Sequence, residues 1–69
     1  MENIATIDFR DIESQDDGCI VLRSGQGQVA VAISLTNNGD VEVFMAAPEA
    51  EKFCNALQTA IQNARKSQL

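Results

Sequence analysis

The sequence predicts an α+β fold: an antiparallel four-stranded β-meander followed by one C-terminal α-helix packed on one sheet face (ββββα). Two patterns carry this prediction. Between Gln28 and Ala46, large apolar residues alternate with small or polar ones on either side of Asn37-Asn38-Gly39, which is typical of a half-buried hairpin. After Pro48, apolar residues recur at spacings of three and four, as on one face of a helix. With 69 residues, the chain is expected to form one domain over residues 1–69.

Two further strands are expected before the hairpin. Asn3 to Phe9 alternates between apolar and polar residues, and Cys19 to Ser24 is rich in Ile, Val and Leu. An acidic, turn-rich segment from Arg10 to Gly18 joins them, and Gly25-Gln26-Gly27 forms a tight turn into the hairpin. The pattern leaves open whether the first strand pairs beside the second or at the other edge.

Matching of the apolar faces predicts the registers, because a slip of one residue turns a strand over. We expect a three-residue loop over residues 37–39, with Gly39 in a left-handed conformation. The expected pairs are Leu35 with Val41, Ile33 with Val43 and Val31 with Met45. A turn at Gln26-Gly27 would likewise pair Leu22 with Val31 and Ile20 with Ile33.

The C-terminal segment has the features of an amphipathic helix. Pro48 suits the first turn, where its missing N–H costs nothing. Acidic residues lie near the expected start and basic residues near the end, which suits the helix macrodipole. We expect its apolar stripe to pack on the sheet, with Cys54 as a small core residue. The stripe consists of Ala50, Phe53, Cys54, Leu57, Ala60, Ile61 and Ala64.

The net charge of −5 is concentrated at the N-terminal end, since residues 1–17 hold six acidic residues and one basic residue. Phosphate backbones and anionic lipids repel such a surface, so direct binding to nucleic acid or membrane is not expected. The sequence has no leader pattern and no apolar run of about 18 residues. We therefore expect a cytoplasmic protein, and its size fits a bacterial or phage accessory protein.

The residue types argue against catalysis. The chain has no His, Tyr or Trp, and its two cysteines, Cys19 and Cys54, are far apart in sequence. Nucleophilic catalysis needs a nearby base, and zinc sites need closely spaced ligands. A calcium loop counted from Asp11 fails, because Asp16 falls where glycine belongs and Leu22 where the closing glutamate belongs. We expect no enzyme activity, no cofactor and no metal.

The sheet face opposite the helix is the first candidate interaction surface. It is composed mainly of small residues with Phe44 among them, and alanine is a weak strand former. A closely approaching second sheet would explain such a face, so the sequence predicts a non-enzymatic protein–protein interaction module that forms a homodimer through it. The expected interface residues are Val21, Arg23, Ala30, Ala32, Ser34, Glu42, Phe44 and Ala46.

Two alternatives remain open from the sequence. The chain would be an acidic inhibitor or regulator if residues 8–17 docked a basic partner, for example a nucleic-acid-binding protein. The carboxylates of that surface would be Asp8, Asp11, Glu13, Asp16 and Asp17. A small-ligand binder or minor enzyme is the second alternative, and it rests only on the presence of carboxylates and thiols.

Overall fold

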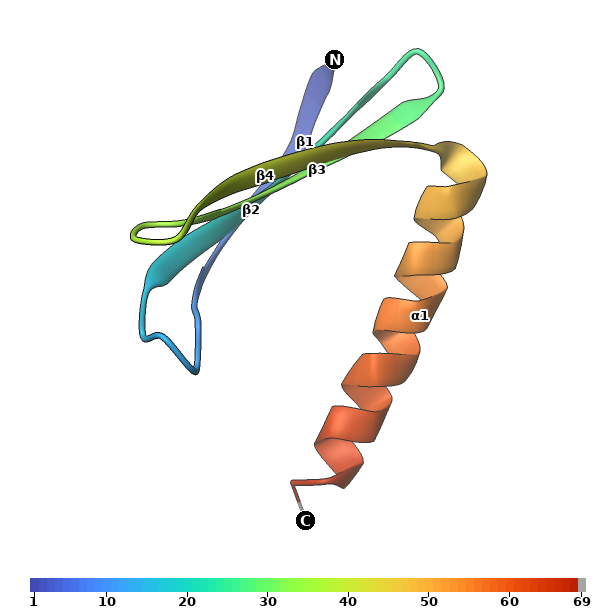
Figure 1. Ribbon diagram of the computed structural model, residues 1–69. Coiled ribbons are helices and arrows are strands. Elements are labelled where there is room, and N and C mark those ends of the chain that lie inside the picture. Colours follow the sequence, from blue (N-terminus) through green and yellow to red (C-terminus); the bar gives the residue numbers. More distant parts are fainter. Residues whose placement is uncertain (69) are drawn as a thin grey trace.

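A computed structural model describes residues 1–68 and confirms the ββββα fold (Figure 1). The strands are β1 (Glu2–Arg10), β2 (Asp17–Gly25), β3 (Gln28–Leu35) and β4 (Gly39–Ala46), and the helix is α1 (Ala47–Lys66). The strands form one antiparallel sheet in the order β1-β2-β3-β4. This order resolves the open question of β1, which lies beside β2 at one edge of the sheet.

The β2–β3 hairpin has the predicted register. Leu22 pairs with Val31 and Ile20 with Ile33, and Gly25 pairs with Gln28 across the turn. Gln26 and Gly27 both have positive φ, at 55° and 77°. Two successive left-handed residues are typical of the type I′ turn, whose twist matches that of the flanking strands.

The predicted register of the β3–β4 hairpin is wrong by two residues. Leu35 pairs with Gly39 instead of Val41, Ile33 with Val41 instead of Val43, and Val31 with Val43 instead of Met45. The loop therefore consists of residues 36–38 and not 37–39, and it is closed by the Asn38 N–H, which donates to the Leu35 carbonyl at 3.2 Å. Thr36 lies in this loop, where its N–H and hydroxyl both donate to the Asp17 carbonyl, at 3.1 and 3.0 Å. A shift of two residues keeps every side chain on its predicted face. Gly39 has the expected positive φ, at 83°.

Gly18 lies within β2, not in the connection that the sequence predicted there. It pairs with Phe9 on one side and Leu35 on the other. A Cβ atom at Gly18 would lie 2.8 Å from the Phe9 ring and 2.7 Å from a Leu35 methyl group. The absence of a side chain therefore lets two large residues close over the strand and fill that corner of the sheet.

The helix begins without a connecting loop. β4 ends at Ala46, which is extended with φ −71° and ψ 158°, and α1 starts at Ala47 with Pro48 in its first turn. Figure 1 shows the helix leaving the end of β4 and running away from the sheet. Within residues 1–68, the backbone of α1 lies close to β3 and β4 but not to β1 or β2. No helix of this part of the chain is both long and apolar enough to cross a membrane.

The resulting core is small. Among the described residues only Ala30 and Val31 are buried, and α1 buries none of its residues. Cys54, expected in the core, is exposed. The radius of gyration is 13.7 Å, whereas a compact chain of this length has about 11 Å. The four strands and the helix all form, but the helix does not cover the sheet.

We predict that Gly39→Val lowers the free energy of unfolding by about 1–3 kcal/mol. A side chain there would meet no atom within 4 Å, so the loss comes from the positive φ alone. Gly39→Asn is the control, because asparagine tolerates this conformation, and it should retain most of the stability. Urea titration measures the free energy of unfolding of both variants and of Asn38→Ala, which should be destabilised less than Gly39→Val. Equal losses for Gly39→Val and Gly39→Asn would contradict the assignment to backbone strain.

Candidate interaction surface

One row of large aliphatic side chains crosses all four strands on the face that the helix overhangs. Ile7 pairs with Ile20, Ile20 with Ile33, and Ile33 with Val41, and we call these four residues the isoleucine row. Ile7 is 48% exposed, Ile33 38% and Val41 57%. Side chains of this kind are normally covered on one face of an antiparallel sheet. The row is therefore an apolar surface without a cover in the single chain.

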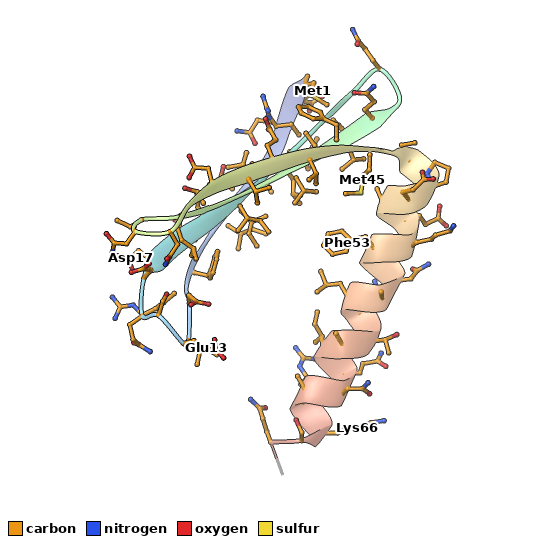
Figure 2. All side chains as sticks on the ribbon, in the orientation of Figure 1. Met1, Glu13, Asp17, Met45, Phe53 and Lys66 are labelled. Atoms are coloured by element: carbon orange, nitrogen blue, oxygen red, sulfur yellow. The ribbon has the colours of Figure 1, made fainter. Side chains whose placement is uncertain are left out.

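The apolar stripe of α1 is equally uncovered. Phe53, Leu57 and Ile61 are between 42% and 49% exposed, although they share the face that the sequence assigned to the core. Figure 2 shows Phe53 directed from the helix into the space beneath the sheet. The opposite helix face is polar. The helix thus presents its one apolar stripe to that space without burying it.

Near the β4–α1 junction the two apolar surfaces enclose a cavity of about 220 Å³. Its lining has residues from the sheet and the first half of the helix, namely Leu22, Val29, Val31, Ala50, Phe53, Cys54 and Leu57. Ile61 and the isoleucine row lie outside this lining, so the cavity occupies only part of the space between the stripe and the sheet. We call the whole space between the stripe and the sheet the helix-side groove.

The predicted interface residues lie on the helix-free face, but in different rows. Phe44 pairs with Ala30 beside Arg23, and Glu42 pairs with Ala32 beside Val21. The registers expected from the sequence would instead pair Phe44 with Ala32, in the row of Val21. The two-residue shift in the β3–β4 hairpin causes the difference. Ala30 is fully buried, whereas Phe44 is 56% exposed. Arg23 and Glu42 form an ion pair across the face.

A shallow hollow of about 230 Å³ lies on the same face beside Cys19, which is half-buried. Ser34, in its wall, donates a hydrogen bond to Asp40. The sequence contains no histidine to activate either nucleophile. No group of three potential metal ligands occurs within residues 1–68.

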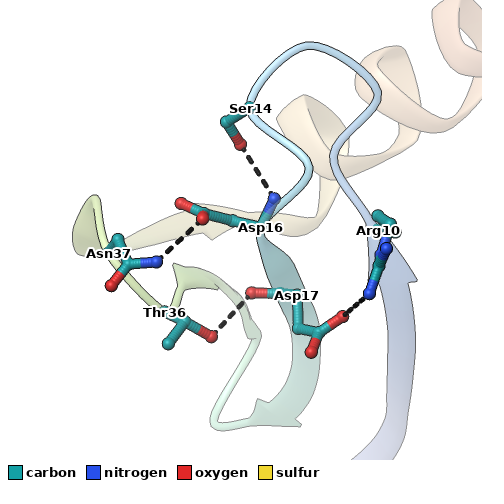
Figure 3. A network of polar contacts seen from close by, with 6 residues as sticks. All are labelled: Arg10, Ser14, Asp16, Asp17, Thr36 and Asn37. Atoms are coloured by element: carbon teal, nitrogen blue, oxygen red, sulfur yellow. Dashed lines mark hydrogen bonds and ion pairs between the residues drawn. The ribbon is translucent and has the colours of Figure 1, made fainter.

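The acidic segment is tied to the rest of the fold by its carboxylates (Figure 3). Asp16 accepts hydrogen bonds from the side-chain amides of Asn37 and Asn38, at 2.9 and 2.6 Å, and Arg10 lies 3.4 Å from Asp17. Hydrogen bonds from the hydroxyl and N–H of Ser14 lower the pKa of Asp11. Three of the five carboxylates that the sequence nominated for docking a basic partner thus have partners within the chain.

We predict that Asp16→Ala lowers the free energy of unfolding by about 1–2 kcal/mol, because two amides lose their acceptor. Glu13→Ala is the matched control, since Glu13 lies in the same exposed segment, and it should change stability by less than about 0.5 kcal/mol. Urea titration at neutral pH measures both. The role assigned to Asp16 would be wrong if the two variants lost the same amount.

We predict that the protonation of Asp11 lowers the free energy of unfolding at acidic pH. Its pKa in the folded chain lies below the ordinary value of 3.8, so the stabilisation is complete above that pH and is lost as the pH falls through the folded pKa. Asp11→Asn should remove this part of the acid dependence while the other carboxylates keep theirs. Urea unfolding of both proteins between about pH 6 and pH 2 measures the difference, and parallel curves would contradict it.

Comparison with protein-family models, with curated proteins and with solved structures finds no significant match to this chain.

Proposed function

We propose that this chain is a non-enzymatic interaction module that forms a homodimer, with the helix-side groove as its interface. The observation that carries the proposal is the amount of surface left open. The folded chain exposes 5462 Å², whereas a compact protein of 7.5 kDa exposes about 4,200 Å². The excess, about 1,200 Å², is larger than the roughly 800 Å² that each partner buries in an interface of standard size.

The chemistry of the groove supports a second copy as the occupant. A surface of this kind needs an apolar partner with a matching stripe, and the chain itself supplies a 20-residue helix with such a stripe. A two-fold dimer uses the same patch on both subunits, so both open surfaces are covered at once. A separate partner protein would need to provide an equal apolar area of its own.

Charge also favours this face for self-association. Two copies of a chain with net charge −5 repel each other wherever their acidic residues meet. The isoleucine row and the helix stripe contain no charged residue. The helix-free face, in contrast, has four acidic residues and two basic ones, namely Asp8, Asp17, Asp40, Glu42, Arg10 and Arg23. Dimerisation through the helix-side groove avoids the repulsion that pairing of the helix-free faces would create.

The other functions considered from the sequence have less support. An acidic docking surface needs accessible carboxylates, and Asp11, Asp16 and Asp17 are already engaged by Ser14, Asn37, Asn38 and Arg10. A ligand-binding or catalytic role needs polar groups that converge in a pocket. The cavity at the junction has only apolar side chains and Cys54 in its lining.

We predict that the wild-type protein has twice the mass of one 7.5 kDa chain in size-exclusion chromatography with light scattering. Val41→Glu should shift it to the monomer, because burial of an unpaired carboxylate in the interface is unfavourable. Phe44→Glu is the matched control. Phe44 lies on the same strand with almost the same exposure, 56% against 57%, but on the helix-free face. This variant should remain a dimer.

The reverse result, in which Phe44→Glu dissociates the dimer and Val41→Glu does not, would assign the interface to the helix-free face that the sequence predicted. A wild-type monomer at high micromolar concentration would contradict self-association itself. Circular dichroism of both variants establishes whether each retains its β-sheet and helix, and Val41→Thr serves as a nearly isosteric, uncharged control.

A further inference from the structure

Two open surfaces remain after the helix has made its contacts with its own sheet. The first half of α1 meets Leu22, Val29 and Val31 around the cavity at the junction. The second half extends beyond the cavity, and in the described part of the chain the backbone of α1 comes close to β3 and β4 but not to β1 or β2. The isoleucine row, which begins at Ile7 on β1, therefore has no helix over it. Ile61, on the second half of the helix, has no sheet beneath it.

The junction explains why the helix does not cover this row itself. β4 passes into α1 at Ala46 and Ala47 without an intervening loop residue, and Pro48 restricts the backbone of the first turn. Only a few dihedral angles set the direction of the helix, and none belongs to glycine. A helix that starts at the end of an edge strand in this way is held away from the far side of its own sheet.

The dimensions of the two open surfaces agree. The row crosses four strands, which spans about 14 Å at the usual spacing of about 4.8 Å between strands. The helix from Leu57 to Lys66 is also about 14 Å long at 1.5 Å per residue. Leu57, Ile61 and Ala64 recur at spacings of four and three on its apolar stripe. One such segment is sufficient to cover one row.

We propose that the dimer is reciprocal: the second half of α1 from each copy lies on the isoleucine row of the other copy, while the first half stays on its own sheet. This inference rests on the proposed homodimer and specifies its arrangement. Each sheet is then covered by two half-helices, one from each copy. The arrangement is closed by two-fold symmetry, so it stops at two chains. The isoleucine row and the stripe residues Leu57, Ile61 and Ala64 contain no charged residue.

Cysteine cross-linking between two distinguishable chains tests the arrangement. In a background with Cys19→Ser and Cys54→Ala, one chain has Ile61→Cys and the other, with an affinity tag, has Ile33→Cys. The two are mixed, unfolded together, refolded and oxidised with a mild reagent. We expect a disulfide between the tagged and untagged chains on a non-reducing gel. The control replaces Ile33→Cys by Phe44→Cys on the helix-free face, and it should yield at most a tenth of that product.

The same experiment separates failure of the arrangement from failure of the dimer. A mixture that has dimer mass but forms no more Ile61–Ile33 product than the Phe44 control would overturn reciprocal docking and leave the homodimer standing. A single chain with both Ile33→Cys and Ile61→Cys should form dimers linked by disulfides. Closure within one chain at monomer mass would show instead that each helix folds onto its own sheet, and would overturn both proposals.

Discussion

The direct junction between β4 and α1 is the constraint on which the rest of this structure depends. Ala46 is still extended and Ala47 is already helical, with Pro48 in the first turn. Because no loop lies between them, the end of the edge strand sets the direction of the helix. The helix therefore contacts β3 and β4 near its start and then leaves the sheet. The open apolar surface, the small core and the large radius of gyration all follow from this geometry.

Much of the fold follows from local chemistry that the sequence displays. The alternation of Val29 to Leu35 indicates a strand, Gln26-Gly27 supplies the two positive φ angles of a tight turn, and the spacing of three and four after Pro48 indicates a helix. The two-residue error in the β3–β4 register concerns Thr36, which lies in the loop and not in the ladder. Thr36 fits a strand by propensity, but both its polar groups bond to Asp17, which is distant in sequence. Alternation alone does not show where the loop begins, because registers two residues apart keep every side chain on the same face.

The candidate interface shows a different limit of sequence reasoning. The sequence assigned Phe53, Leu57 and Ile61 to the core and looked for an interface on the face that seemed left over. In the structure these residues are about half exposed, and the helix-side face is the more apolar of the two. Amphipathic periodicity identifies which side of a helix is apolar, but it does not identify the surface that the side covers. The sequence did contain one indication that the helix would not cover the sheet, because it leaves no room for a loop between the last strand and Pro48.

The distribution of charge on the surface agrees with the interface that we propose. The acidic residues that give the chain its charge of −5 lie outside the apolar stripe and the isoleucine row, and two of them, Asp11 and Asp16, accept hydrogen bonds that hold the segment between β1 and β2. In the proposed dimer, repulsion between acidic residues would oppose association through other surfaces more than through the uncharged groove. The same distribution would limit association to two chains, because the dimer would expose mainly its acidic surface.

The central claim is that two chains complete one hydrophobic core, and the concentration dependence of unfolding tests it most directly. Association stabilises a dimer by mass action, so its midpoint of thermal unfolding rises with chain concentration. Between about 2 and 200 µM the account predicts a rise of several degrees, since this range changes the free energy of association by about 2.7 kcal/mol. A midpoint that stays constant across this range would show that the single chain is stable alone, and would contradict the account.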